Sequence, residues 1–400
     1  MKENWTYKKL GEVCEIERGG SPRPITDYIT ESSDGINWIK IGDAVDGSKY
    51  ISSTKEKIKP EGVKKSRMVH KGDFILSNSM SFGKPYILNI DGCIHDGWLV
   101  IHDTNDTFDK SFLYYLLGNP NMYLEFKRLA VGGVVNNLNS QLVRSVVVPV
   151  PPLEEQERIV EELDLLSGVI EKQKQQLKEL DTLAQSIFYD TFGDPITNEK
   201  NWPVKKLGEI SSKISNGSNA KLEEDTYKKE GIMYFRCQNV WRNRFDYSDL
   251  VFIDEETNFK LKSSSLKHND LLITKIGRIN TENSSLGRVS LYEGEDDKAN
   301  LSGNLCFIRL NKDNCPKYIL SILISNEFRD YIRRTTVGGI DKRALNVKQI
   351  SSFPIILPPL SLQLEFAEKI EMIEKQKEAI SQSIKETQQL FDYTMDKYFG

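Results

Sequence analysis

Loops rich in arginine, lysine, asparagine, serine and glycine hold the side chains of this sequence that are best suited to bind another molecule. Residues 241–245 alternate cationic with aromatic side chains, and residues 333–343 place a glycine pair between two basic pairs. Two further polar loops cover residues 77–84 and 275–280. Arg, Lys, Asn and Gln form paired hydrogen bonds with the edges of nucleobases, whereas Ser, Thr and backbone N–H groups beside glycine suit phosphates. These loops predict contacts with a nucleic acid, although an ordinary solvated surface is the alternative for any single loop, and a purely conformational role is the alternative for the glycine pairs.

Other chemistries find no support in the sequence. The chain lacks the G-x-x-x-x-G-K-S/T phosphate loop, the G-x-G-x-x-G dinucleotide motif and the Asn/Asp-Pro-Pro-aromatic tetrapeptide that an adenine amino-methyltransferase uses. Its five cysteines never form C-x-x-C, and its four histidines have no ligand spacing, so we expect neither a zinc site nor disulfide bonds. His70 and His268, beside Asp73 and Asp270, are interpreted as surface residues at strand edges. We therefore expect no catalytic residue, no metal and no cofactor in this chain.

The net charge of −4 is unevenly distributed along the sequence. Residues 1–150 carry a net charge of +1 and residues 202–357 carry +5, whereas residues 151–201 carry −7 and residues 358–400 carry −3. A polyanion would meet the two neutral to basic segments and be repelled by the two acidic ones. Ordinary scatter explains the +1 of the first segment equally well.

Hydrophobicity places the chain among proteins that work in water. Hydrophobic residues make up 38% and charged residues 28% of the sequence. No apolar stretch approaches the roughly 20 residues that span a bilayer, and the first residues lack the apolar core of a signal peptide. We therefore expect a cytoplasmic protein without a membrane partner.

The sequence contains one long internal repeat. The run at residues 5–13 returns at 202–210, the Pro-Pro-Leu-x-x-Gln run at 151–156 returns at 358–363, and both halves end in Phe-Gly. The offset grows from 197 to 207, so the second globular half is about ten residues longer, as loops tolerate. A duplicated unit presents two similar surfaces in a pseudo-twofold arrangement, which suits a ligand that itself offers two sites.

The two acidic segments have the pattern of long helices that pair in an antiparallel coiled coil. Apolar residues recur at steps of four and three over about four heptads, and each proline pair stands at a helix start, where proline is tolerated. About forty residues would give a rod of roughly 60 Å. The alternative is that each helix packs on its own domain alone. The predicted seam consists of Ile159, Leu163, Leu166, Ile170, Leu177 and Leu180 in the first helix and Phe366, Ile370, Ile373, Ile380 and Ile384 in the second.

Each globular half mixes short β-like runs with one helical stretch, which favours an α+β fold over a doubly wound sheet. In the first half the predicted strands lie at 36–41, 73–76, 98–101 and 145–150, with a helix near 111–117. In the second half they lie at 232–236, 270–274, 305–308 and 353–356, with a helix near 318–332. The predicted organisation is a globular domain at 1–150, a spacer helix at 151–193, a linker at 194–201, a second domain at 202–357 and a second spacer helix at 358–400.

The duplicated order of these features resembles the DNA-specificity subunit of type I restriction-modification systems. The resemblance covers essentially the whole chain, and it rests on the Trp-x-x-x-Lys-Leu-Gly-Glu openings at Trp5 and Trp202, the strand-turn at residues 39–43 with its counterpart at 235–239, the run at 71–76 and the Pro-Pro-Leu-x-x-Gln helix starts. It implies two target recognition domains that each contact one half of a split duplex-DNA sequence, with the paired helices as a ruler. It also implies two modification subunits that methylate adenine with S-adenosylmethionine, and restriction subunits that join for cleavage.

The resemblance also places candidate DNA-binding residues on the loops described above. Family members often carry Arg where this chain has Asn78 and Lys275, a departure that alters which base or phosphate is met. The two halves differ in nearly all of these side chains, so the implied target is bipartite and asymmetric. The candidates are Lys40, Ser77, Asn78, Lys84, Asn136, Asn137, Arg236, Gln238, Arg242, Arg244, Thr274, Lys275, Arg278, Arg288, Lys342 and Arg343.

Two other functions remain open from the residues alone. A coiled-coil scaffold whose globular halves bind proteins would explain the repeat and the helices. A stand-alone methyltransferase would bind S-adenosylmethionine by itself.

Overall fold

The computed structural model describes residues 4–45, 47–79, 83–130, 138–218, 222, 226–278, 281, 283–336, 338–339 and 341–400. The chain forms two compact units, Met1–Lys174 with Ser381–Gly400, and Gln175–Ile380. Each unit holds one globular domain, the first part of the helix that follows this domain, and the last part of the other long helix. The fold is α+β in both units, as the sequence predicted.

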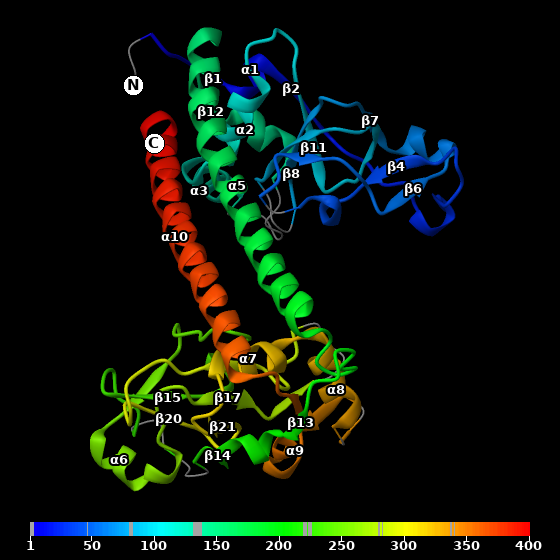
Figure 1. The fold of residues 1–400 in the computed structure, drawn as a ribbon. Helices are drawn as coiled ribbons and strands as arrows, with labels where there is room; N and C mark the ends of the chain where they lie inside the picture. Colours follow the sequence, from blue (N-terminus) through cyan, green and yellow to red (C-terminus); the bar gives the residue numbers. More distant parts are fainter. Residues whose placement is uncertain are drawn as a thin grey trace. The chain divides into compact units, whose positions relative to one another are not determined.

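Two five-stranded sheets form the first globular domain (Figure 1). One sheet has the order β2 (Cys14–Arg18), β11 (Trp98–Asp103), β8 (Phe74–Ser77), β9 (Pro85–Leu88) and β5 (Tyr50–Ile51). The other has the order β3 (Ile29–Thr30), β6 (Glu56–Ile58), β4 (Ile36–Ile39), β10 (Gly92–Ile94) and β7 (Arg67–Val69). A separate antiparallel ribbon joins β1 (Thr6–Lys9) to β12 (Val147–Val150). The helices are α1 (Leu10–Val13), α2 (Lys110–Gly118), α3 (Pro120–Ala130) and α4 (Ser140–Ser145).

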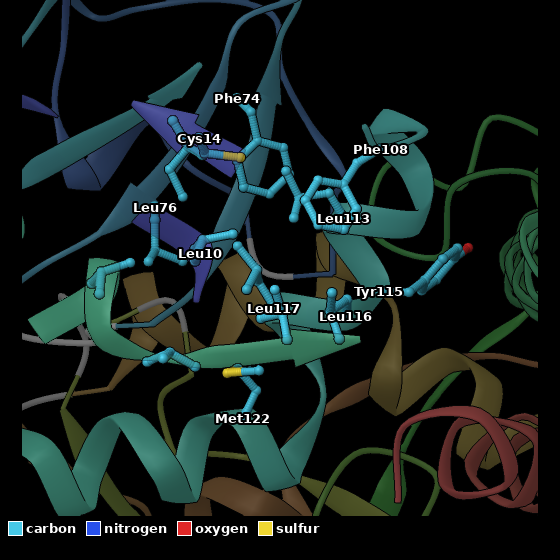
Figure 2. Close-up of a cluster of buried hydrophobic side chains, with 14 of the residues drawn as sticks. Leu10, Cys14, Phe74, Leu76, Phe108, Leu113, Tyr115, Leu116, Leu117 and Met122 are labelled. Carbon is cyan, nitrogen blue, oxygen red and sulfur yellow. The ribbon is translucent and has the colours of Figure 1, made fainter. Parts of the chain in front are cut away.

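The main core of this unit lies between the first sheet and helix α2. Figure 2 shows Leu113, Leu116 and Leu117 of α2 gathered with Leu10 and Leu76, and all five side chains are at most 2% exposed. Burial of a side chain of this size stabilises the fold by about 1.5–3 kcal/mol. The Tyr115 ring lies at the margin of the cluster, with its hydroxyl pointing outward (Figure 2).

The second globular domain repeats this plan with different strand lengths. Its four-stranded sheet has the order β14 (Ser211–Asn216), β21 (Leu305–Leu310), β17 (Leu271–Thr274) and β19 (Val289–Leu291), which matches β2, β11, β8 and β9. Its three-stranded sheet has the order β16 (Val251–Ile253), β15 (Ile232–Phe235) and β20 (Ala299–Leu301), with a parallel pair β15·β20 that matches β4·β10. Two ribbons complete it: β13 (Val204–Lys206) with β23 (Pro354–Ile356), and β18 (Ile276–Arg278) with β22 (Lys342–Ala344). The helices are α6 (Glu255–Lys260), α7 (Pro316–Ile324), α8 (Asn326–Thr335) and α9 (Val347–Ser351).

Glycine stands at one close approach that both domains share. A Cβ atom built on Gly19 would lie 2.2 Å from the carbonyl oxygen of His95, and one built on Gly217 would lie 2.2 Å from that of Ser302. Any side chain at either position would therefore displace the backbone. The matching contacts place the residues after β2 and β14 in the same position in the two domains.

The expected strands all form, with bounds that differ by one or two residues, but the prediction of one helical stretch in each half was wrong. In the second half the stretch near 318–332 is divided at Ser325, which ends α7 and caps α8 by accepting a hydrogen bond from the Phe328 N–H. In the first half α2 is followed directly by α3. A serine at a helix N-cap competes with helix continuation, and this favours a new start.

The two predicted spacer helices are α5 (Leu153–Phe192) and α10 (Leu360–Phe399), which are the two longest helices in Figure 1. A buried glutamine fixes the start of each helix to its own domain. Gln156 accepts a hydrogen bond from the Asp109 N–H and donates to the carbonyl oxygens of Thr107 and Pro151, each at 2.9 Å. Gln363 accepts from the Cys315 N–H at 3.2 Å and donates to the Pro358 carbonyl at 2.9 Å.

Within each unit the two helices pair in antiparallel fashion. In the first unit Tyr398 donates to Glu162 at 2.7 Å, and Gln173 donates to Ser383 at 2.7 Å. In the second unit Lys377 lies 2.8 Å from Asp181. Every residue of the predicted seam is buried or half-buried, namely Ile159, Leu163, Leu166, Ile170, Leu177, Leu180, Phe366, Ile370, Ile373, Ile380 and Ile384. The helices therefore contact both their own domain and each other, so packing on the own domain alone is excluded.

Among the described helices, none combines the length and the apolar composition that crossing a bilayer requires.

Candidate nucleic-acid interface

The end of strand β8 forms the centre of the candidate surface in the first domain. The Asn78 N–H donates to the Gly97 carbonyl at 2.9 Å, and its side-chain amide donates to the Asp96 carbonyl at 3.1 Å. Ser77 and Asn78 are each 1% exposed, and the Ser77 hydroxyl accepts a hydrogen bond from the Lys84 N–H at 2.9 Å. Both side chains thus hold the backbone of neighbouring loops, whereas the Lys84 side chain is exposed.

A charged cluster that the sequence reasoning missed surrounds this strand end. The Asp96 carboxylate accepts hydrogen bonds from Ser21 at 2.9 Å and Arg23 at 3.4 Å, and the Asp96 carbonyl accepts from Arg18 at 2.9 Å. The Asp96 pKa is lowered: burial alone would raise it, but the Ser21 hydrogen bond and the charges of His95, Arg18 and Arg23 outweigh burial. The side chain therefore offers an ionised acceptor between two arginines.

His95 has a fixed tautomer in this cluster. The Gly97 N–H donates to its Nδ1 at 2.9 Å, so its Nε2 carries the proton and lies 3.0 Å from Asp96. Burial lowers the His95 pKa below its usual value, and the nearby Lys40 acts in the same direction. Lys40 itself forms a 2.5 Å ion pair with Glu56. In the sequence, these residues could have been found only from the glycines beside them, Gly19 after Arg18 and Gly97 after Asp96.

In the second domain Lys275 occupies the position of Asn78. Its N–H donates to the Asn304 carbonyl at 3.1 Å, the counterpart of the Asn78–Gly97 bond. Its ammonium donates to the Asn216 side chain at 2.7 Å, and burial lowers its pKa. The preceding Thr274 is fully buried, and its hydroxyl donates to the Ser285 carbonyl and accepts from the Arg288 N–H. Thr274 is therefore engaged inside the domain.

The ribbon of β18 and β22 brings two sequence-predicted residues together. Arg278 and Lys342 are direct partners in the antiparallel register, and both are exposed. Arg278 also lies 3.3 Å from Asp341. The next pair in the register is Gly277 with Arg343, whose guanidinium donates to carbonyl oxygens of helix α8 and the residue after it. Because adjacent pairs point to opposite faces, one face of the ribbon is basic and exposed while Arg343 holds the ribbon to the domain.

Three other predicted residues of the second domain are engaged by neighbouring groups. Arg236 donates to the Asp249 carbonyl at 2.5 Å, and Gln238 donates to the Asp249 carboxylate at 3.1 Å. The guanidinium carbon of Arg288, which is 8% exposed, lies 3.8 Å from the centre of the Trp241 ring. In contrast, Arg244 is exposed and Arg242 is half-buried. Asn136 and Asn137 lie outside the described residues.

The described part of the chain gives no geometry for other chemistry. It places no three His, Cys, Asp or Glu side chains where they would hold a metal, and its five cysteines are free thiols. His70 and His268 are exposed, as predicted, whereas the neighbouring Asp270 is fully buried and forms a 2.6 Å ion pair with Arg309, the pairing that a buried charge requires.

Comparison with known proteins identifies the family. The family model of the type I restriction modification DNA specificity domain matches residues 2–182 and again residues 199–389. The specificity subunit of the type I restriction enzyme MjaIX from Methanocaldococcus jannaschii is 25% identical over 386 residues, covering 92% of this chain and 86% of the relative. The specificity subunit of EcoBI from Escherichia coli is 21% identical over 398 residues, covering 93% and 80%.

Solved structures share the fold over the whole chain. The type I restriction-modification S subunit from M. genitalium aligns with a TM-score of 0.57 at 14% identity, covering 99% of this chain and 96% of its own. A chain solved in a study of complex assembly and conformational transition of the type I R-M system aligns with a TM-score of 0.59 at 19% identity, covering 100% and 98%. The chain therefore belongs to the type I restriction-modification DNA specificity family, as a specificity subunit rather than a catalytic one, and it carries the domain of that family twice.

Proposed function

We propose that this chain binds duplex DNA at a bipartite, asymmetric sequence and that each globular domain contacts one half of it. The observation that carries the proposal is the exposed basic face of the β18·β22 ribbon, on which Arg278 and Lys342 are direct partners. The major groove of B-DNA admits a two-stranded β-ribbon, and an arginine can form two hydrogen bonds with guanine there. Arg278 is therefore the proposed base contact of the second domain, with Lys342 beside it.

The chemistry of the two domains supports an asymmetric target. At matching strand ends, the first domain presents the Asp96 carboxylate beside Ser21 and Arg23, whereas the second presents Lys275 beside Asn216. A carboxylate accepts hydrogen bonds from the amino groups of cytosine or adenine, but a lysine donates to acceptors such as those of guanine. Two different half-sites follow from these different donor and acceptor sets.

Repeated exposed apolar side chains on the long helices support the docking of two modification subunits. In the first unit Leu153, Leu165 and Leu390 are 48%, 69% and 51% exposed. In the second unit the side chains at matching positions, Leu360, Met372 and Leu183, are 37%, 60% and 47% exposed. Exposed apolar side chains that recur in both copies fit two equivalent protein partners.

In this role the chain selects the sequence, and its partners perform the chemistry. Modification subunits transfer methyl groups from S-adenosylmethionine to adenine, and restriction subunits join them for cleavage, all in the cytoplasm. The chain itself needs no cofactor for recognition.

Mapping methylated adenines across the genome of cells that carry this chain and its partners tests the proposal. The expected result is one bipartite sequence with two different half-sites. An Arg278→Ala variant should lose about 1–3 kcal/mol of binding and relax the second half-site alone. Lys205→Ala, an exposed lysine on β13, is the matched control and should change neither half-site.

Three outcomes would contradict the proposal. An absence of any shared methylated sequence would contradict recognition itself. DNA affinity that does not increase on addition of the modification subunits would favour the protein-binding scaffold. Uptake of S-adenosylmethionine by the isolated chain, measured by calorimetry, would favour a stand-alone methyltransferase.

A further inference from the structure

A tight turn in the second domain presents two arginines next to a groove of about 510 Å³. Val240 and Phe245 form an isolated antiparallel bridge, and the Trp241 N–H donates to the Arg244 carbonyl at 3.0 Å. Between them Asn243 has a φ of +53°, the left-handed conformation that asparagine tolerates better than most residues. Arg242 and Arg244 therefore flank the tip of the turn, and both line the groove together with residues of α5, α7 and α10.

The turn is held rigidly against the domain and against helix α10. The Ser290 hydroxyl donates to the carbonyl oxygens of Trp241 and Arg244, at 2.8 and 2.9 Å. Arg288 stacks on the Trp241 ring while its guanidinium donates to the carbonyl oxygens of Ser284 and Asn283. The Asn243 side chain donates to Glu374 of α10 at 3.3 Å. Arg288 is thus a positioning residue that fixes the turn from inside.

The cations at this turn outnumber the acids that could balance them. Within the described part of the chain, the Arg242 guanidinium has no hydrogen bond or ion pair, although it is half-buried. Burial lowers the pKa of Arg242 to about 10, and Arg329, Arg333 and Arg288 act in the same direction. The acid that opposes this effect on Arg242 is Asp330, which lies 3.3 Å from Arg333.

The acids that line the groove are already engaged by a lysine. Lys377 lies 2.8 Å from Asp181 and 3.4 Å from Glu374. The guanidinium carbon of the exposed Arg244 lies 5.1 Å from the centre of the Trp241 ring, and its charge also acts on the carboxylate of Asp246. An arginine remains protonated at neutral pH, so the repulsion persists until an anion binds.

The matching turn of the first domain shows that this arrangement is specific to the second. That turn contributes Lys49 in place of the arginines, and the Lys49 ammonium lies 2.9 Å from Asp164 of α5 and over the rings of Tyr114 and Tyr115. Its side chain is 14% exposed. The cation of the first turn therefore forms a contact within its own unit, whereas the two arginines of the second turn remain available.

We propose that Arg242 and Arg244, supported by Arg329 and Arg333, bind backbone phosphates of the DNA beside the second half-site. The proposal rests on the proposed function and assigns these residues to positioning of the duplex, in contrast to base reading by Arg278. Arginine is suited to this role because its guanidinium forms paired hydrogen bonds with phosphate oxygens. Contacts of this kind fix the register of a protein on the duplex and carry no sequence information.

Salt-dependent binding of the complete complex with its modification subunits tests this assignment. The probes are a duplex that carries the mapped target and a duplex of equal length with the second half-site scrambled. Each phosphate contact contributes roughly 0.9 to the slope of log K against log salt, so Arg242→Ala with Arg244→Ala should lower the slope by about 2. Affinity at 0.15 M salt should fall roughly tenfold for each arginine, equally on both duplexes. Lys205→Ala with Lys206→Ala, two exposed lysines of β13, is the control of equal charge change and should leave the slope unchanged.

The outcomes separate this inference from the proposed function. If the wild-type complex does not distinguish the two duplexes, the proposed function fails. If it does, and the double variant keeps the wild-type slope, the phosphate contact is refuted. A loss confined to the target duplex would assign the arginines to base reading, which also refutes it. Failure of the double variant to assemble with the modification subunits, seen by size-exclusion chromatography, would instead assign the turn to an acidic protein segment.

Discussion

Replacement of Gln156 by leucine is expected to destabilise the first unit strongly. Leucine has a similar volume but no polar atoms, so the change removes three hydrogen bonds at a fully buried position. Each buried bond of this kind contributes about 1–1.5 kcal/mol, and its loss leaves the Asp109 N–H and two carbonyl groups without a partner. The free energy of unfolding of the first unit should therefore fall by about 3–4.5 kcal/mol.

The matching Gln363→Leu change gives an internal scale. Gln363 makes two such bonds, so the second unit should lose about 2–3 kcal/mol. Gln176→Leu, at an exposed position of α5, is the control and should stay within about 0.5 kcal/mol. Hydrogen exchange measured by mass spectrometry reports the opening free energy of each unit separately.

Two results would refute this reasoning. A loss below about 1 kcal/mol in Gln156→Leu would show that the glutamine is not the anchor of the helix start. Equal destabilisation of both units by both variants would show that the anchors do not act within their own units.

Three further predictions concern charge, pH and helix length. Arg309→Met leaves the fully buried Asp270 carboxylate without its cationic partner, which should lower the free energy of unfolding by about 3–5 kcal/mol at pH 8. Because burial already raises the pKa of Asp270, this loss should shrink as the pH falls and the carboxyl group takes up a proton. A loss of stability that is independent of pH in urea unfolding would contradict the prediction. Burial lowers the pKa of His95, so below about pH 6.5 the unfolded chain binds a proton that the folded chain resists, and the first unit should lose stability as the pH falls below this value. His95→Gln should remove that part of the pH dependence in calorimetry, and an identical pH profile in the variant would disprove the prediction. Deletion of residues 173–179 together with 380–386 shortens each helix by about 10 Å, which corresponds to about three base pairs of DNA. Methylation mapping should therefore show a correspondingly shorter stretch of DNA between the two half-sites. An unchanged separation of the half-sites would rule out the helices as a ruler.

The repeat and the two helices could be predicted from the sequence because both are periodic signals. The heptad pattern located α5 and α10, and the proline pairs and Phe-Gly endings placed their ends within two residues of those observed. The shared runs at the helix starts also indicated the buried glutamines Gln156 and Gln363. A polar residue that recurs at the same helix position in both copies is expected to bind the same kind of group in each. The break at Ser325 was missed because the apolar pattern continues across it, and only the capping geometry ends the helix.

The candidate surface was less predictable, because residue type does not reveal which way a loop side chain points. Thr274 and Arg288 have the chemistry of nucleic-acid contacts, yet the fold uses one for a backbone carbonyl and the other to hold Trp241. The Arg23–Asp96 pair joins segments far apart in the sequence, so no spacing rule could find it. Whether two residues of a ribbon lie opposite each other depends on the register of its strands. For Arg278 and Lys342 only the structure shows this register.

The order in which the two units can fold during synthesis follows from the segments of the chain that each unit contains. The second unit is one uninterrupted stretch, Gln175–Ile380, and it is complete before synthesis ends. The first unit needs Met395 and Tyr398, which are 7% and 5% exposed in its core. The domain that is translated first is thus the last to close, because its final apolar side chains are synthesised after the whole of the second unit. A nascent or prematurely terminated chain would leave this core open to water and to the cell's chaperones and proteases.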